Sequence, residues 1–330
     1  MAAELVAGIE RAVFGPVSAD DVTAWLDRHV SQRLSARVST VLFRTGRVSA
    51  VYGLLLSDGT SVVAKVFRQP GSPKALAAAV ACQGTLARAG YPCPMPLDGP
   101  AVTDSRIVLL ESLLPAGEPG DAHRPEIRRG MARSLARHVR LLRAVPLITR
   151  ELRDPPAWAR YTDGPWPIPH DPIFDFALTP PGYQWLDDLA RAAADALRHP
   201  SGPRVAGHSD WYCGNLRFRD DAVVAAYDWD SLITDTEPVI AGLSAGCHTA
   251  DSIHRPEAPA PGQVRAFLID YETARAERFS PGQQAAAAAA ATWVMAYNAR
   301  CQLSVGATDV SGSPLATLSI YRREYLSLRW

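Results

Sequence analysis

The chain has 330 residues, of which 47% are hydrophobic and 21% are charged, so it can bury a core large enough for one large domain or two lobes. Its formal net charge is zero, which argues against a nucleic-acid-binding protein, because such proteins carry a basic excess. No apolar run reaches the roughly eighteen residues of a membrane span, so no membrane association is expected.

The cysteines and the first residues bear on location. The five cysteines are scattered and show no C-x-x-C pair, so neither a disulfide framework nor a zinc site is expected. The start, Met1 to Glu4, lacks the basic region of a secretory signal. These features predict a cytoplasmic protein and leave its oligomeric state open.

Residues 1–38 are expected to form a helical extension. Ser18 and Asp21 have the spacing of a capping box at the start of a helix. The apolar residues that follow share one helical face: Val22, Trp25, Leu26 and Val30. We expect the extension to pack on the structure that follows it.

Between residues 39 and 67 the apolar pattern becomes that of three antiparallel strands. Asp58-Gly59 marks a tight turn before the third strand. Gly46 lies in the first turn, with Ser49 after it, and on its own this turn is simply part of a hairpin. The third strand contains Lys65, one of only two lysines in the chain.

Residues 73–89 predict a helix rich in Ala and Leu. This helix contains no acidic residue, and Gln83 is its only long polar acceptor. The proline-rich stretch at 90–96 is expected to be extended. Residues 106–114 are expected to form a buried strand.

Helices alternate with irregular chain in the next part. We expect helices at 123–145, 181–198, 264–278 and 283–303. Residues 151–181 are irregular, and long loops of this kind are often lids or binding loops. A substrate-facing role and simple packing both remain open for the five aromatic residues of this loop, which are Trp158, Tyr161, Trp166, Phe174 and Phe176.

The functional interpretation depends on the pattern H-x-D-x-x-x-x-N, formed by His208, Asp210 and Asn215 and followed by Asp228. Residues 216–226 between the two motifs indicate a β-hairpin. A hairpin brings its open ends together, so Asn215 and Asp228 are expected to lie close enough to share a metal ion. Phosphoryl transfer needs these residue types. One carboxylate accepts or orients a hydroxyl proton, while an amide oxygen and a second carboxylate hold Mg²⁺.

This segment resembles the catalytic core of the aminoglycoside phosphotransferase and choline kinase superfamily, with Ser209 in place of its usual Gly and Tyr227-Asp228-Trp229 as its second motif. The likeness covers roughly residues 40–300. It implies an α+β, two-lobed fold of the protein-kinase type. After the helical extension, the nucleotide-binding N-lobe would be antiparallel and β-rich, at 39–113. The catalytic and substrate-binding C-lobe would be mainly helical, at 114–330.

The resemblance also implies roles for individual residues. Asp210 is the expected catalytic group, and Asn215 and Asp228 are the expected Mg²⁺ ligands. His208 is expected to be a scaffold, and Asp230 to support the site or contact substrate. ATP is the expected nucleotide, with GTP also possible. Its expected contacts are Gly46, Ser49 and Lys65 at the phosphates and the backbone of Glu111, Ser112 and Leu113 at the base.

The implied activity is phosphorylation of a hydroxyl on a small molecule, first of all an aminoglycoside or another hydroxylated antibiotic. A metabolite such as an amino sugar, choline or homoserine is the alternative acceptor. The family usually has a Glu on the helix at 73–89 to pair with the strand lysine, and its absence here keeps a nucleotide-binding pseudoenzyme open. A metal hydrolase using His208 and Asp210 is disfavoured, because no further histidine cluster lies nearby.

Overall fold

The computed structural model describes residues 2–46, 49–68, 73–115, 117–145, 151–152, 155–162, 164–199, 202–250, 257–308 and 310–330. Two compact units make up the chain, Met1–Pro115 and Ala116–Trp330, here called unit 1 and unit 2. No described helix combines the length and the apolar character needed to cross a membrane.

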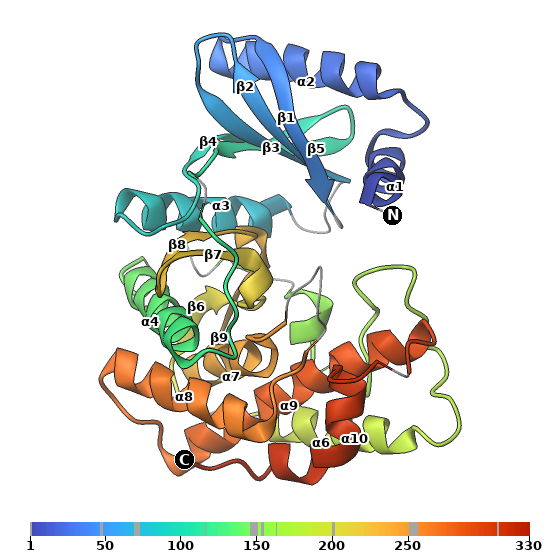
Figure 1. Cartoon of the computed structure of the whole chain (residues 1–330), viewed down its shortest axis with the longest axis vertical. Coiled ribbons are helices and arrows are strands. Elements are labelled where there is room, and N and C mark those ends of the chain that lie inside the picture. Colours follow the sequence, from blue (N-terminus) through green and yellow to red (C-terminus); the bar gives the residue numbers. More distant parts are fainter. Residues whose placement is uncertain are drawn as a thin grey trace. The chain divides into compact units, whose positions relative to one another are not determined.

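Unit 1 is built on a five-stranded sheet in which every strand pairs antiparallel with its neighbours, in the order β1-β2-β3-β5-β4 (Figure 1). The three strands expected between residues 39 and 67 are present, and the buried strand expected at 106–114 is β5. The elements of this unit are α1 (Ala2–Phe14), α2 (Ala19–Leu34), β1 (Val38–Gly46), β2 (Ala50–Leu56), β3 (Ser61–Arg68), α3 (Pro73–Arg88), β4 (Pro96–Thr103) and β5 (Arg106–Ser112).

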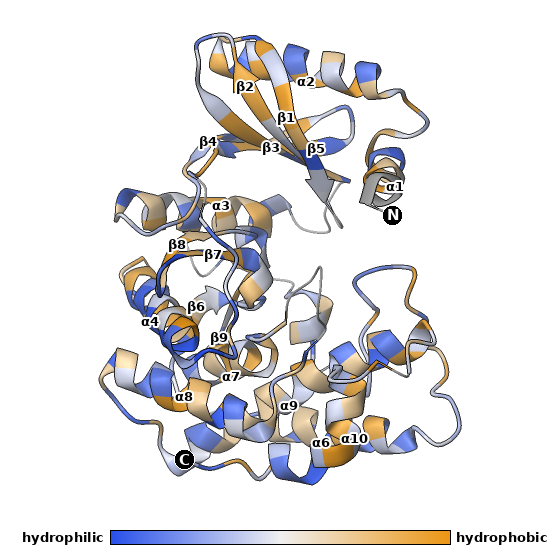
Figure 2. Cartoon of the chain, viewed as in Figure 1, coloured by the Kyte–Doolittle hydropathy of each residue, from blue (hydrophilic) through white to orange (hydrophobic). Residues whose placement is uncertain are grey.

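Helices cover both faces of this sheet. One face shares a continuous apolar core with α1 and α2, and the other packs against α3 through Phe67, Leu76 and Leu109. Apolar and polar residues alternate along α2 (Figure 2), which begins at the predicted capping box of Ser18 and Asp21. The helical extension is therefore part of the core of unit 1.

Strand β4 has no counterpart among the strands expected from the sequence. It begins at Pro96 and contains Gly99-Pro100, residues that disfavour a central strand. As the last strand in the order, β4 pairs on one side only, with β5. An edge strand tolerates missing N–H donors, so sheet context overrode the local sequence signal.

Unit 2 is mainly helical, so the α+β class expected from the sequence is confirmed. It also contains two small antiparallel sheets, β6-β9 and β7-β8. Its elements are α4 (Pro125–Leu142), η1 (Ala157–Ala159), α6 (Gln184–Leu197), β6 (Arg204–His208), η2 (Cys213–Asn215), β7 (Leu216–Arg219), β8 (Ala222–Ala226), η3 (Trp229–Ser231), β9 (Leu232–Thr236), α7 (Glu237–Cys247), α8 (Pro261–Arg275), α9 (Pro281–Ser304) and α10 (Pro314–Tyr325).

The alanine run of α9 has a packing role. All eleven residues of α7 are buried, and its glycines face the alanines of α9. A Cβ at Gly246 would lie 2.6 Å from the carbonyl oxygen of Ala291, and one at Gly242 would collide with the carbonyl of Ala287. Small residues on both helices therefore allow their backbones to approach closely.

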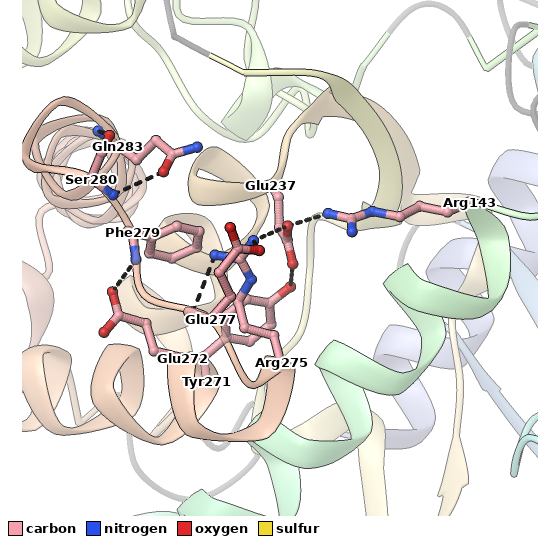
Figure 3. Close-up of polar contacts among 9 residues, drawn as sticks. All are labelled: Arg143, Glu237, Tyr271, Glu272, Arg275, Glu277, Phe279, Ser280 and Gln283. Atoms are coloured by element: carbon pink, nitrogen blue, oxygen red, sulfur yellow. Dashed lines mark hydrogen bonds and ion pairs between the residues drawn. The ribbon is translucent and has the colours of Figure 1, made fainter.

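An ion-pair network holds the start of α7, directly after β9 (Figure 3). The carboxylate of Glu237 contacts the guanidinium of Arg143 and that of Arg275, the second at 3.0 Å. It also accepts a hydrogen bond of 2.9 Å from the hydroxyl of Tyr271. Burial, and then the Glu237 charge, raise the pKa of that hydroxyl, so Tyr271 stays a donor.

We expect Glu237→Ala to lower the free energy of unfolding by about 3 kcal/mol, because the largely buried guanidinium of Arg275 and the buried hydroxyl of Tyr271 both lose the buried carboxylate that they contact. Urea denaturation measures the loss. Glu277→Ala is the matched control, since Glu277 contacts the same Arg275 at 3.1 Å but has a 73% exposed side chain. That control should cost less than about 1 kcal/mol. Equal losses in the two variants would show that the network does not hold α7.

Candidate active site

The two motifs of the functional interpretation meet in unit 2. Strand β6 ends at His208, which is paired with Leu232 of β9. The hairpin predicted between Asn215 and Asp228 is present as β7-β8. Its open ends are joined by a 3.0 Å hydrogen bond from the N–H of Tyr227 to the carbonyl of Asn215. The backbone therefore brings Asn215 beside the residue that precedes Asp228, and the sharing of a metal ion by these two residues stays a prediction.

His208 links the two motifs through its ring. Its Nδ1 accepts a 3.2 Å hydrogen bond from the N–H of Asp210, and its Nε2 lies 2.9 Å from the carbonyl oxygen of Tyr227. A carbonyl only accepts, so this arrangement assigns the proton to Nε2. With both nitrogens engaged in a fully buried ring, His208 has the geometry of a scaffold. The same contacts disfavour its use as a metal ligand.

A second buried histidine, His138 of α4, was not singled out from the sequence. Its Nε2 accepts a 3.2 Å hydrogen bond from the N–H of His208. Burial, and then the neighbouring His208, hold the pKa of His138 well below its usual range, so it is neutral. Trp211 and Trp229 pack edge-on against its ring. The sequence does place His138 on the same helical face as Leu135, Val139 and Leu142, and this pattern could have indicated that it is buried.

Asp210 is partly exposed and lies beside Asn215. The Nδ2 of Asn215 donates to the carbonyl oxygen of Asp210 at 3.0 Å and to its Oδ2 at 3.2 Å. This use of the amide nitrogen leaves the Oδ1 of Asn215 as the atom able to face a cation. The carboxylate of Asp210 and the side-chain amide of Asn215 are therefore held side by side.

Asp228 has a left-handed backbone, with φ 61° and ψ 46°. Non-glycine residues rarely adopt this region, and such positions cluster at functional sites. Asp228 directly follows Tyr227, whose N–H is bonded to Asn215. Together, Asn215 and Asp228 supply the hard oxygen donors that Mg²⁺ prefers, so the residues present fit this ion. Asp230, two residues on, is exposed.

Ser209, which replaces the family's usual Gly, ties the loop to the irregular segment. Its hydroxyl donates to the carbonyl of Ser231 at 2.8 Å and accepts a 3.2 Å hydrogen bond from the indole of Trp158. Trp158 and other aromatic residues of segment 151–181 pack against Tyr297 of α9. The segment is thus anchored directly beside Asp210.

Lys65 in unit 1 has a partner that the sequence interpretation did not identify. Its Nζ lies 3.9 Å from Oε1 of Glu111, and both side chains are buried. Gln83 of α3 donates from Nε2 to Oε2 of Glu111 at 2.8 Å and to the carbonyl of Pro94 at 2.9 Å. The carboxylate that the resembled family usually has on this helix is absent from α3, and Glu111 of β5 supplies one to Lys65 and to Gln83.

Backbone hydrogen bonds within unit 1 limit which groups can contact the nucleotide base. The N–H of Ser112 donates to Met95 at 2.8 Å and that of Leu113 donates to Ser61 at 3.2 Å, so both are used within unit 1. A contact of Ser112 or Leu113 with the nucleotide base would therefore use a backbone carbonyl group, because both N–H groups are already bonded.

The first turn of the sheet contains Gly46 and Ser49, while residues 47–48 lie outside the described part. Gly46 has φ 138°, and a Cβ there would collide with the carbonyl oxygen of Ser49. Glycine is thus required by the turn itself. A phosphate contact by Gly46 and Ser49 remains a proposal.

Comparison with known proteins identifies the family. The model of the phosphotransferase enzyme family matches residues 40–277. No curated protein sequence matches the chain. Among solved structures, an amicoumacin kinase, hAmiN, in complex with AMP-PNP, Ca²⁺ and Ami is similar with a TM-score of 0.63 and 12% identity, over 94% of this chain and 96% of that one.

Two further structures show the same fold. Macrolide 2'-phosphotransferase MphH from Brachybacterium faecium has a TM-score of 0.52 and 16% identity, over 91% of this chain and 98% of its own. Aminoglycoside phosphotransferase APH(4)-Ia, as a thermostable mutant with AMP-PNP and hygromycin B, has a TM-score of 0.55 and 12% identity, with the same coverage. These likenesses confirm the kinase-like fold. Because the family model spans most of its length, the chain belongs to the phosphotransferase enzyme family, and it is a phosphotransferase that acts on a small-molecule hydroxyl group.

Proposed function

We propose that the chain is an ATP-dependent O-phosphotransferase that modifies a hydroxylated antibiotic and uses Mg²⁺. The observation that carries this proposal is the arrangement in unit 2. The ring of His208 bonds to the backbone of both Asp210 and Tyr227, the residue before Asp228. Asn215 bonds to the carboxylate of Asp210 and, through its carbonyl, to the N–H of Tyr227. The bound nucleotide analogues and antibiotics named for the similar structures support it. Five buried free cysteines support a reducing, cytoplasmic location.

In this mechanism Asp210 orients the acceptor hydroxyl and accepts its proton as the oxygen attacks the γ-phosphorus. A new P–O bond forms to the acceptor while the bond to the β–γ bridging oxygen breaks, and ADP leaves. Mg²⁺, held by Asn215 and Asp228, would neutralise charge on the phosphate oxygens. Lys65 would bind phosphate oxygens as a cation, and His208 keeps the loop in place.

Of the alternative functions considered from the sequence, the pseudoenzyme loses its support and the metabolite kinase keeps it. The pseudoenzyme was suggested by the missing acidic residue on α3, and that reason falls because Glu111 supplies a carboxylate to Lys65. A metabolite kinase for an amino sugar, choline or homoserine remains the second candidate, since the same machinery serves any alcohol. GTP remains a possible donor.

We propose that segment 151–181 contributes to the acceptor site. Trp158 is half-buried, and its indole bonds to the residue next to Asp210. Three large apolar side chains of the segment are exposed, namely Ile168 by 88%, Ile173 by 65% and Leu178 by 84%. An acceptor with an apolar or ring-shaped face suits this surface better than one that presents only charge.

Trp158→Ala is expected to raise the KM for the acceptor about tenfold, or about 1.4 kcal/mol, and to leave the KM for ATP unchanged. Steady-state kinetics with each substrate varied in turn measures both constants. Trp185→Ala is the matched control, because Trp185 lies on α6, outside this segment, where the guanidinium of Arg322 lies over its ring. A similar rise for both variants, or a rise in the KM for ATP, would refute an acceptor contact by Trp158.

The function is tested by a coupled ADP-release screen over aminoglycosides, macrolides, peptide and nucleoside antibiotics, amino sugars and small alcohols. Acceptor-dependent ADP release, with a phosphorylated product identified by mass spectrometry, is expected for an antibiotic. Turnover confined to a metabolite would replace the antibiotic by the second candidate. Nucleotide binding without release on any acceptor would contradict the proposal.

A further inference from the structure

We propose that the carboxylate of Glu111, anchored in the sheet, positions Lys65 for the nucleotide phosphates independently of helix α3. The inference rests on the proposed function, because it takes Lys65 as the phosphate-binding cation. It makes Glu111 a positioning residue whose side chain acts through Lys65. It assigns to α3 only a supporting amide, from Gln83.

The burial of the pair requires that the two charges compensate each other. The side chains of Lys65 and Glu111 are exposed by only 7% and 3%. A buried charge is tolerated when it is paired and hydrogen-bonded. Oε1 of Glu111 faces Lys65, and Oε2 accepts from Gln83. Burial, and then the neighbouring Glu111, raise the pKa of the Cys93 thiol to about 12, so this thiol stays neutral beside the pair.

The sheet fixes where both members of the pair lie. Strands β3 and β5 are direct neighbours (Figure 1), with Val63 opposite Glu111 and Lys65 opposite Leu109. Side chains two residues apart on a strand share a face, so Lys65 and Glu111 are diagonal neighbours on one face. Their separation is set by the hydrogen-bonded ladder between β3 and β5, in which α3 takes no part.

Helix α3 contributes differently. It packs on this face through Leu76 and Val80, and Gln83 donates to both Glu111 and the carbonyl of Pro94. A neutral amide cannot replace the charge of the carboxylate. Displacement of α3 would therefore remove both hydrogen bonds of Gln83 but leave the partners of the ion pair on β3 and β5, so the orientation of Lys65 is built into the sheet and not switched by the helix.

The test compares two ligands by titration calorimetry, ADP and adenosine, because only ADP carries phosphates. Glu111→Gln is expected to weaken ADP binding about tenfold, or about 1.4 kcal/mol, and to leave adenosine binding unchanged. Lys65→Ala should show the same selective loss. If Glu111 acts through Lys65, the double variant should bind ADP no more weakly than Lys65→Ala alone.

Two further variants define the roles of charge and helix. Glu10→Gln is the matched control, since Glu10 pairs with Arg44 at 2.9 Å beside the other face of the sheet, and it should change neither affinity. Gln83→Met should weaken ADP binding less than Glu111→Gln does. An equal loss of ADP affinity in the two variants would overturn the inference, because it would show that α3 determines the orientation of Lys65.

The remaining outcomes separate the inference from the proposed function. Equal losses for ADP and adenosine in Glu111→Gln, or additive losses in the double variant, would overturn the inference alone. A wild-type protein that binds ADP no better than adenosine would overturn the phosphate role of Lys65 and the inference with it. Selective, non-additive losses would support the inference, whatever acceptor the enzyme uses.

Discussion

Asp210→Asn is expected to lower kcat by about 10²–10⁴-fold, the usual contribution of a positioned general base, while nucleotide affinity stays near that of the wild type. At about 1.36 kcal/mol per tenfold change, this is a loss of roughly 3–5 kcal/mol of transition-state stabilisation. An amide at this position can still align a hydroxyl but cannot accept its proton.

The hydrogen bonds around Asp210 can be kept when this residue is replaced by Asn. Asn215 donates to Oδ2 of Asp210 at 3.2 Å, and an amide oxygen at the same place can accept that bond. Other hydrogen bonds of Asp210 use its backbone atoms: its N–H donates to His208, and its carbonyl accepts from Asn215 and from the N–H of Tyr212. The loop should therefore keep its conformation in the variant.

Two measurements are paired in this experiment, with ADP release giving turnover and calorimetry giving Mg²⁺–ATP affinity. Asp220→Asn is the matched control, because Asp220 is an exposed residue of the hairpin turn with φ 56°, a conformation that Asn adopts readily. It should leave turnover unchanged. Near-normal turnover of Asp210→Asn with intact binding would show that Asp210 is not the base, and joint loss of both would indicate a structural or metal role.

The sequence predicts the arrangement of this site where local pattern determines it. The turn residues of 219–221 between short apolar runs predict the β7-β8 hairpin, and the hairpin alone brings Asn215 to the neighbourhood of Asp228. The capping box at Ser18 is local in the same way. Short sequence separation leaves few alternative geometries, so pattern and structure agree.

The partner of Lys65 shows where this reasoning stops. The sequence locates β3, β5 and α3, yet the contact between Lys65 and Glu111 depends on which strands are neighbours and in which register. Glu111 was interpreted through its backbone, and Gln83 as the only long polar acceptor of α3. Neither reading shows that the two side chains meet, because a strand of apolar residues does not reveal the register of its pairing.

The contact of His138 with His208 has the same origin. It joins residues 70 positions apart, and only the packing of α4 under the catalytic loop creates it. The Ser209 hydroxyl is similar, since its bond to Trp158 spans 51 positions. Side chains that hold a site from a distance carry little local signal, whereas the groups proposed to do the chemistry follow a fixed spacing.

Asp228→Asn is expected to lower turnover by about 10²-fold or more, because a catalytic metal ion contributes several kcal/mol of charge stabilisation in the transition state. It should also abolish the dependence of nucleotide affinity on Mg²⁺. Asn is preferred to Ala, since φ at this position is 61° and a left-handed backbone costs most L-residues about 1–2 kcal/mol but is tolerated by Asn. The substitution then tests the carboxylate and not the turn.

Calorimetry with ATP in the presence of Mg²⁺ and of a chelator measures the metal dependence directly. The wild type should bind ATP more tightly with Mg²⁺, and Asp228→Asn should bind it equally in both conditions. Asp228→Ala adds the backbone cost, so a larger loss of unfolding free energy in that variant would report strain alone. If Asp228→Asn retained the full difference between the two conditions, Asp228 could not be a ligand of the ion. The bond between Tyr227 and Asn215 would then serve only to close the hairpin.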